Sequence, residues 1–314
     1  MSFLKNCWFD RHSAFAIGEN KECIEGYVFS TEEMNLTLAF PIGADSKLVQ
    51  SVETVFTESE LDRFAEELNR DGICVIRGLF DRDLIDRWKV AFDALFQERQ
   101  QRPGGLAPRG QARCYATLPW VAPFADPAVF ANPIIRGVLN RGFFQEYKLV
   151  QLAADIPLQG SQYQEIHRDF RPLFSDQIVT PLYALAVNFS LVEVTEANGP
   201  FEMARGTHVM SREEGLVKVH AGEIAMEQFY MQPGDVMIRS PLALHRGTPN
   251  LTPEPRPMIV MGYVMHWLHT QKVDLTLPRA YYESLPPELQ ELLRCRVVEQ
   301  LADSEVETYI NFAY

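Results

Sequence analysis

Hydrophobic positions after residue 56 follow a helical period and then change to a strand-like one. Apolar side chains recur every three or four residues across 57–72, and Thr57 with Glu60 three positions later has the spacing of a capping box. Gly72 is placed to end this helix. The run 73–80 is rich in β-branched residues and therefore predicts a short strand.

A second amphipathic period covers residues 81–100 and predicts a helix that begins at Asp81 or Asp83. The segment that follows, 102–115, is rich in glycine and proline, and we expect an irregular loop there. A loop of this length in a compact domain is usually functional or mobile. We therefore treat it as a candidate wall of a binding site.

The period becomes strand-like between residues 147 and 267. Short apolar segments alternate with turn residues, and we find no helical stretch between them. Many short strands in succession are typical of a β-sandwich or a jelly-roll barrel. We therefore expect a mainly β fold with flanking helices, with strands in 147–156, 182–194, 199–208, 234–245 and 256–267.

The ends of the chain are harder to interpret. Residues 36–40 alternate weakly and predict one strand, and the sequence after Pro278 returns to a helical period that restarts at Pro286. No repeat, low-complexity segment or Gly/Ser linker divides the chain. The organisation we predict is a single domain, 1–314, made of an N-terminal extension (1–55), a core with leading helices (56–270) and a C-terminal helical segment (271–314).

Composition argues against several classes of partner. A formal net charge of -13 and the absence of a basic stretch argue against a nucleic-acid partner. The five cysteines are odd in number and lack CxxC spacing, which favours reduced thiols in a cytoplasmic protein. We expect neither a signal peptide nor a membrane partner, because the N-terminal region carries charges and the longest apolar stretch is short. A homo-oligomer is compatible with the sequence, which does not fix the oligomeric state.

Candidate chemistry appears in "EIHRDF", where His167 and Asp169 stand two positions apart. In an extended segment such residues point to the same side, so the two side chains can converge. His245, at the end of a predicted strand, is the candidate third group. Two imidazoles and one carboxylate form the facial triad of non-haem iron(II) oxygenases, which leaves three coordination positions open. An H-x-D triplet taken alone is more often hydrogen-bonded structure than a metal site.

Arg256 strengthens the metal hypothesis. It follows His245 by eleven positions and starts a predicted strand. If 2-oxoglutarate chelates the iron through its keto acid, a planar guanidinium on a neighbouring strand suits its distal carboxylate. The structural alternative for Arg256 taken alone is an exposed charge at a strand edge.

Four motifs together point to a family. The segments "QEIHRDF", "EANGPFEMARGTH", "QPGDVMIRSPLALHRGTPN" and "RPMIVMGYV" resemble the phytanoyl-CoA dioxygenase-like branch of the Fe(II)- and 2-oxoglutarate-dependent oxygenases. The resemblance covers residues 55–270 approximately. It implies a double-stranded β-helix (jelly-roll, cupin-like) core that binds Fe(II) through His167, Asp169 and His245 and 2-oxoglutarate through Arg256, with O2 as the other co-substrate.

The resemblance also implies further contacts to the co-substrate. Gln164 and Asn188 match positions that assist 2-oxoglutarate in similar proteins, and each is equally compatible with an ordinary polar role in a strand. Thr248 is a candidate contact to the distal carboxylate or, alternatively, a hydroxyl that stabilises a turn. Arg205 stands where relatives carry a proline, and we expect His208 in the same motif to support a turn.

The implied reaction is oxidation, by default hydroxylation, of a C–H bond in a small-molecule metabolite or natural-product intermediate, with release of succinate and CO2. Halogenation is not expected, because related halogenases replace the carboxylate that Asp169 retains. Desaturation, epoxidation, cyclisation and ketone formation use the same ligands and stay open. Candidate substrate-lining residues are Arg109, Arg113, Tyr115, Trp120, Arg171 and Phe174, whereas His266 and His269 are expected to face solvent or to pack.

Two other hypotheses stay open at this point. One is a cupin-like metal enzyme that is independent of 2-oxoglutarate and does not need Arg256. The other is a non-catalytic metabolite-binding β-sandwich, in which His167, Asp169 and His245 form only hydrogen bonds. The motifs of several other enzyme classes, G-x-G-x-x-G, the P-loop and G-x-S-x-G, are absent from the sequence.

Overall fold

The computed structural model describes residues 56–143, 146–175, 179–269 and 275–301. The chain divides into two units, 1–55 and 56–314, and all described residues belong to the second. The predicted N-terminal extension and the strand predicted at 36–40 therefore lie outside the described residues. The domain boundaries given above stay a prediction.

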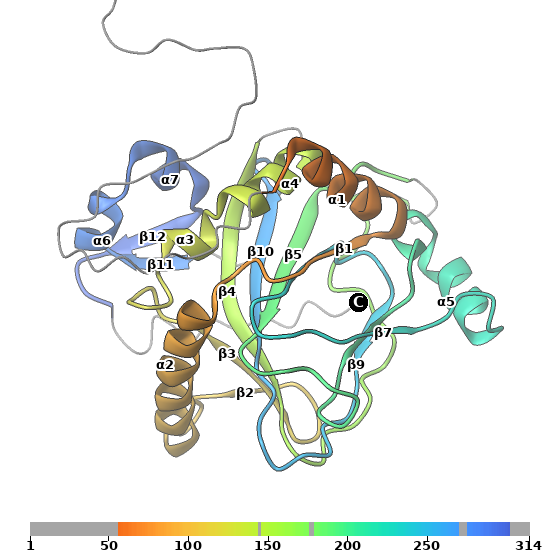
Figure 1. The fold of residues 1–314 in the computed structure, drawn as a ribbon, viewed down its shortest axis with the longest axis horizontal. Coiled ribbons are helices and arrows are strands. Elements are labelled where there is room, and N and C mark those ends of the chain that lie inside the picture. Colours follow the sequence, from red (N-terminus) through yellow and green to blue (C-terminus); the bar gives the residue numbers. More distant parts are fainter. Residues whose placement is uncertain (1–55, 144–145, 176–178, 270–274, 302–314) are drawn as a thin grey trace, which may run out of the picture. The chain divides into compact units, whose positions relative to one another are not determined.

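In the described part of the chain, two antiparallel sheets and a separate strand pair make up the β structure (Figure 1). The strands are β1 (Ile73–Ile76), β2 (Ala107–Pro108), β3 (Arg113–Thr117), β4 (Tyr147–Pro157), β5 (Ala184–Ser190), β6 (Phe201–Met203), β7 (Glu227–Phe229), β8 (Val236–Arg239), β9 (His245–Gly247), β10 (Met258–Met265), β11 (Leu275–Pro278) and β12 (Cys295–Val298). The larger sheet has the order β1-β8-β5-β10-β4-β3-β2 and the smaller one β7-β6-β9, whereas β11 and β12 pair in parallel. Non-sequential neighbours in both antiparallel sheets are what a jelly roll requires.

Helices flank these sheets. Within the described residues they are α1 (Glu58–Asp71), α2 (Arg82–Gln101), α3 (Pro127–Phe130), α4 (Pro133–Phe143), α5 (Arg212–His220), α6 (Arg279–Ser284) and α7 (Pro287–Leu292). None of them is long and apolar enough to cross a bilayer.

The two leading helices have the caps that the sequence predicts. The Thr57 hydroxyl accepts a hydrogen bond from the Glu60 N–H at 3.3 Å, and the Glu60 carboxylate accepts one from the Thr57 N–H at 2.8 Å. Gly72 ends α1 with a φ of 77°, a left-handed conformation that favours glycine. Asp81, and not Asp83, caps α2 by accepting a hydrogen bond from a first-turn N–H.

The prediction of an irregular loop at 102–115 is wrong in part. Strands β2 and β3 pair with each other, and β3 pairs with β4 from Arg113 to Thr117. The long neighbouring strand supplies the backbone partners that make β3 a strand, which local composition does not reveal. As a result, Arg113 and Tyr115 share one face of the sheet.

The expectation of no helix among the strands is also wrong, because α5 lies between β6 and β7. Ser211 caps this helix by accepting a hydrogen bond from the Glu214 N–H at 3.0 Å. Only Gly215 of α5 is buried. The helix therefore lies on the surface and lacks the apolar period from which a helix is predicted.

The C-terminal segment is helical only in part. The two short helices α6 and α7 are separated near Pro286, and β12 takes the place of the helix expected after them. Val297 and Val298 suit a strand, and β12 finds a parallel partner in β11.

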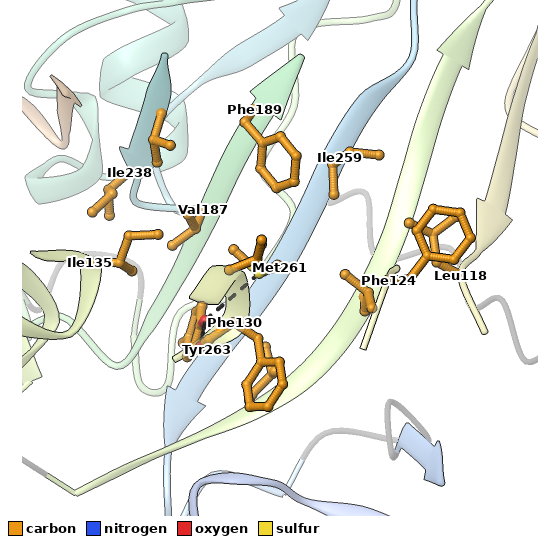
Figure 2. Packing of buried hydrophobic residues seen from close by; sticks show 14 of the residues in the cluster. Leu118, Phe124, Phe130, Ile135, Val187, Phe189, Ile238, Ile259, Met261 and Tyr263 are labelled. Atoms are coloured by element: carbon orange, nitrogen blue, oxygen red, sulfur yellow. Dashed lines mark hydrogen bonds between the residues drawn. The ribbon is translucent and has the colours of Figure 1, made fainter. Parts of the chain in front are cut away.

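Alternate residues of the larger sheet face two different interiors. Val187 and Phe189 of β5, Ile238 of β8 and Ile259 of β10 pack into the main hydrophobic core with side chains of α1, α2 and α4 (Figure 2). Trp88 of α2 meets Phe189 edge-on, with ring centroids 5.2 Å apart. The residues between these positions point to the opposite face of the sheet, and that face lines the cavity described next.

Candidate active site

A cavity lined by strands of both antiparallel sheets collects most of the residues singled out from the sequence. The larger sheet contributes residues of β3, β4, β5, β8 and β10, and the smaller sheet contributes residues of β6 and β9. The predicted residues in its lining are Arg109, Arg113, Tyr115, Gln164, His167, Asp169, Asn188, His245 and Arg256.

Backbone pairing places the two predicted histidine ligands directly opposite each other in an antiparallel bridge. The His167 N–H donates to the His245 carbonyl at 3.0 Å, and the His245 N–H donates to the His167 carbonyl at 3.0 Å. Their ring centroids are 4.4 Å apart. Asp169 follows on the same segment, and its N–H donates to the carbonyl of Pro241 at 2.9 Å. Two segments far apart in the sequence are thereby fixed in register, so all three side chains meet.

The outer nitrogen of each imidazole is engaged by the backbone. Nδ1 of His167 lies 2.7 Å from the Glu165 carbonyl, and Nδ1 of His245 lies 2.8 Å from the Ala243 carbonyl. Because a carbonyl only accepts hydrogen bonds, each Nδ1 carries a proton, and each Nε2 is the ring nitrogen that faces the cluster. This is the outer hydrogen bond that metal-binding histidines ordinarily make.

Asp169 completes the cluster. Its Oδ1 lies 3.7 Å from Nε2 of His167, and its Oδ2 lies 3.3 Å from Nε2 of His245. One ligand atom from each of these three residues lies within 4.8 Å of the other two. Two imidazoles and one carboxylate on one side of a small gap match the donor set and arrangement of a facial triad.

The charge states of this cluster suit a divalent metal. Burial lowers the pKa of His245 to about 4, so its imidazole is neutral at neutral pH. Burial raises the pKa of Asp169, but two effects outweigh it and hold that pKa well below its ordinary value: the charge of His245, which is protonated in the acid range where Asp169 titrates, and the charge of Arg239. A neutral imidazole and an ionised carboxylate are the forms that coordinate metal. The residues present therefore fit an iron ion.

Arg168, between the two ligands in "HRD", points away from the cluster. Its Nη2 donates to the carbonyls of Thr207 at 2.9 Å and Met210 at 2.8 Å. Arg168 is 2% exposed. It therefore connects the segment that carries the ligands to the turn at 207–210.

Arg256 lies in the same cavity, and no carboxylate among the described residues forms an ion pair or hydrogen bond with its guanidinium. The residue is 2% exposed, and its Nε is buried without a hydrogen-bond partner among the described residues. Burial, together with the nearby charge of Arg113, lowers the pKa of Arg256 to about 10, so the side chain is still a cation at neutral pH. Asp155 is a nearby anion, but its two carboxylate oxygens accept hydrogen bonds from Arg113. A buried cation without a hydrogen-bonded anion is costly, so this side chain fits an anionic ligand.

Arg113, predicted to contact substrate, lies near Arg256 instead of forming a separate subsite. Its Nε and Nη2 donate to the two carboxylate oxygens of Asp155 at 3.0 and 2.5 Å. The Nη1 of Arg113 is buried and has no partner in the described part of the chain. Two arginines and one carboxylate leave this end of the cavity with an excess of positive charge, which favours a carboxylate ligand.

The other residues predicted to contact the co-substrate differ in how many of their polar atoms already form hydrogen bonds within the protein. Gln164 lines the cavity, and its Oε1 accepts from the Gly247 N–H at 2.9 Å. Asn188 donates to the Ile259 carbonyl at 3.2 Å and accepts from Arg239 at 3.2 Å. Thr248 is not part of the lining, and its hydroxyl donates to a backbone carbonyl at 2.7 Å, which is the turn-stabilising alternative.

The candidate substrate residues separate into two groups. Arg109 and Tyr115 line the cavity. Trp120, at 2% exposure, belongs to the main hydrophobic core instead. Phe174 is 66% exposed and Arg171 is also exposed, and neither lines the cavity.

The remaining residues of interest lie outside the cavity. Arg205, which replaces the proline of relatives, pairs with Glu227 and Asp71. The Nε2–H of His208 donates to the Asn69 carbonyl, 3.1 Å away, and His208 is not one of the three clustered residues. His266 is exposed beside Glu146, and His269 is exposed.

Sequence reasoning missed Arg239 and Asp155. Both line the cavity; Arg239 follows the apolar residues of β8, and Asp155 follows the apolar run 152–154 of β4. Because a strand covered on both faces reads as a continuous apolar run, a charge within it is the signal that points to a site. That signal was available in "VMIR" and "QLAADI".

Comparisons with known proteins agree with this geometry. A family model described as phytanoyl-CoA dioxygenase (PhyH) matches residues 68–258. Dioxygenase trt7 of Aspergillus terreus is 21% identical over 247 residues, covering 75% of this chain and 84% of that protein. Iron/alpha-ketoglutarate-dependent dioxygenase ausO of Aspergillus calidoustus is 23% identical over 243 residues, covering 73% of this chain and 80% of that protein.

A solved structure shares the fold. The epimerase SnoN in complex with Fe3+, alpha ketoglutarate and nogalamycin RO superimposes with a TM-score of 0.56 at 15% identity, covering 74% of this chain and 92% of that one. At this identity the similarity shows the fold alone, and it confirms the mainly β jelly-roll prediction.

The class that fold and site define is an iron- and 2-oxoglutarate-dependent dioxygenase. The family match spans more than half of the chain, and the chain belongs to the phytanoyl-CoA dioxygenase family. The predictions of this family and of Fe(II), 2-oxoglutarate and O2 as the cofactors of its class are confirmed.

Proposed function

We propose that this protein oxidises a C–H bond of a small molecule, by default to an alcohol, using Fe(II), 2-oxoglutarate and O2. The observation that carries the proposal is one cavity with two complementary ends. At one end His167, Asp169 and His245 present a metal-binding donor set. At the other, Arg256 is a buried cation that no carboxylate in the described part of the chain pairs with or hydrogen-bonds to.

The residues present have separate tasks in this proposal. His167, Asp169 and His245 hold the metal on one side and leave the opposite side open for ligands. Arg256, with Arg113 beside it, binds the distal carboxylate of 2-oxoglutarate. When bound, iron and 2-oxoglutarate supply the oxidising power, with release of succinate and CO2. The protein orients the ligands and keeps bulk water from the site.

The unpartnered Arg256 favours this function over the two alternatives. A 2-oxoglutarate-independent metal enzyme has no use for a buried cation at that position, and a passive binding module has no use for two imidazoles with inward-facing lone pairs. Asp169 also argues against halogenation, because its carboxylate occupies the ligand position that chloride would need.

A small natural-product-like substrate is supported by two observations. The cavity combines the metal cluster with apolar side chains such as Phe201, Val260 and Met258. In addition, the structurally similar SnoN was crystallised with nogalamycin RO. Hydroxylation, epimerisation, cyclisation and desaturation share this ligand set, and the substrate's reacting carbon decides between them.

The test is substrate-dependent succinate release. Purified protein loaded with Fe(II) is supplied with 2-oxoglutarate and O2 and screened against small metabolites, with succinate and substrate products measured by mass spectrometry. We expect turnover that stops when either iron or 2-oxoglutarate is left out. Turnover that is indifferent to 2-oxoglutarate would contradict the proposal. A product mass 16 units above its substrate would show the gain of one oxygen atom, by hydroxylation or by epoxidation of a double bond, and a substrate without a double bond separates the two.

A further inference from the structure

We propose that Arg239 is a positioning residue with two tasks: it restrains Asp169 to coordinate iron through one oxygen, and it binds the iron-chelating carboxylate of 2-oxoglutarate. Arg239 ends β8 on the cavity face of the larger sheet. The inference rests on the proposed function, because it assigns a protein group to that co-substrate. It concerns the metal end of the cavity, whereas Arg256 serves the distal end.

Three contacts fix the Arg239 guanidinium. Its Nη2 donates to Oδ2 of Asp169 at 2.8 Å, and its Nε donates to Oδ1 of Asn188 at 3.2 Å. Its Cζ lies 4.9 Å from the ring centroid of Phe201. With the side chain only 8% exposed, the guanidinium has little freedom to adopt another position.

The contact with Asp169 bears on coordination. A carboxylate that chelates a metal through both oxygens occupies two positions, and a facial triad needs three positions left open. Since Oδ2 of Asp169 already accepts from Arg239, Oδ1 is the oxygen left for the metal. Hydrogen bonds to the second oxygen of a metal-binding carboxylate are a common means of fixing its orientation.

The remaining nitrogen points to a ligand. Nη1 of Arg239 is buried and has no hydrogen-bond partner among the described residues. A buried charged donor without an acceptor is unfavourable, so an oxygen that the protein does not supply fits here. The carboxylate nearest to it, Asp169, is engaged through Nη2, and the Asn188 oxygen is engaged through Nε.

The chemistry of 2-oxoglutarate supplies that oxygen. Bound to iron through its keto acid, it places one carboxylate at the metal, and Arg239 contacts a metal ligand directly. The neutral amides predicted for this task are less free. Both polar atoms of Asn188 are used within the protein, and Oε1 of Gln164 is held by the N–H of Gly247. Arg239 is therefore the charged donor at this end of the cavity.

The experiment compares two 2-oxo acids that differ at the distal end. Pyruvate keeps the keto acid of 2-oxoglutarate but lacks the second carboxylate. Dissociation constants for both are measured anaerobically on Fe(II)-loaded wild type, Arg239→Lys, Arg239→Met and Arg256→Met, from the visible charge-transfer band of the chelate. Arg205→Met is the control, because Arg205 pairs with two carboxylates outside the cavity lining.

Arg239→Met and Arg239→Lys should raise the dissociation constants of 2-oxoglutarate and pyruvate by similar factors. Loss of one charged hydrogen bond corresponds to about tenfold or more. Arg256→Met should weaken the binding of 2-oxoglutarate and leave the binding of pyruvate unchanged. The lysine variant keeps a cation beside Asp169 but lacks the second guanidinium nitrogen that would bind 2-oxoglutarate. Its affinity for iron should therefore stay within about threefold of wild type, a factor smaller than the loss of one charged hydrogen bond. Arg205→Met should match wild type throughout.

Three results would overturn the assignment. The first is wild-type affinity for both 2-oxo acids in Arg239→Lys, and the second is a loss confined to 2-oxoglutarate. The third is failure of Arg239→Lys to bind iron, which would mean that Arg239 supports only the metal site and does not bind the co-substrate. If the wild-type protein binds iron but neither 2-oxo acid, the proposed function itself is refuted. This outcome differs from the three above, which refute only the role of Arg239.

Discussion

Arg113 lies so close to the backbone of Gly247 that a Cβ built on this glycine would be 2.0 Å from Nη1 of the arginine. Asp155 holds the guanidinium in this place through two hydrogen bonds. Gly247 is also two residues after His245 on β9. One short strand therefore carries a candidate metal ligand, His245, and also contacts Arg113 at the cationic end of the cavity. Glycine is needed here because of the close approach.

Gly247→Ala should lower the free energy of unfolding by about 1–3 kcal/mol, the usual cost of overpacking. The added methyl group displaces the Arg113 guanidinium, which cannot move without leaving Asp155. In an Arg113→Ala background the same substitution should cost much less, because the collision is gone. Denaturant unfolding of the two single variants and the double variant measures this coupling, and strictly additive losses would contradict it.

Asp155→Asn should lower stability by about 3 kcal/mol at neutral pH, because it leaves Arg113 buried without its carboxylate partner. Burial raises the pKa of Asp155, but Arg113 outweighs it and holds that pKa below its ordinary value. The carboxylate's contribution is therefore present above its unfolded pKa, about 3.9, and is lost as the pH falls through the lower folded pKa.

The difference in unfolding free energy between wild type and Asp155→Asn should thus be constant from pH 7 to about pH 5 and shrink below about pH 4. The control is Asp93→Asn, which removes the surface partner of Lys89 and should cost less than about 1 kcal/mol. A wild-type advantage that grows on acidification would show that Asp155 is not held as an ion pair.

His245→Ala should abolish stoichiometric Fe(II) binding, because the triad loses one of its three ligands. His208→Ala is the matched control, since His208 faces the Asn69 carbonyl and is outside the cluster. Metal content after anaerobic loading and desalting measures the difference. Equal iron content in the two variants would remove His245 from the metal site.

Thr57→Ala should destabilise the protein by about 1 kcal/mol through loss of the capping hydrogen bond. Thr57→Ser keeps the hydroxyl and should retain most of the stability. Thermal unfolding of the two variants checks the prediction. A serine variant as unstable as the alanine variant would mean that the methyl group, and not the cap, stabilises this end of α1.

The clustering of the three candidate metal ligands could be predicted from the sequence because their spacing encodes their geometry. His167 and Asp169 share one side of an extended segment, and the family motif supplies His245 and Arg256. The capped helices were equally readable, since Thr57 and Glu60 act within one turn. Such features depend on neighbours in the sequence.

What the sequence did not reveal depends on pairing between distant strands. Arg113 became part of a strand only through β4, and its partner Asp155 lies on that same strand. Arg239 meets Asp169 across 70 residues of sequence, so no local pattern records the contact. Conversely, Phe174 lies five residues after Asp169 in the sequence and is nevertheless exposed, because the chain leaves the cavity after the ligand.

The most direct test of the central claim is an anaerobic titration of the Fe(II)-loaded protein with 2-oxoglutarate, followed by the visible charge-transfer band of the chelate. We expect a saturable band in wild type, a band that needs much higher 2-oxoglutarate in Arg256→Met, and no band in His245→Ala. A protein that holds one iron per chain and yet gives no band at saturating 2-oxoglutarate would contradict the account.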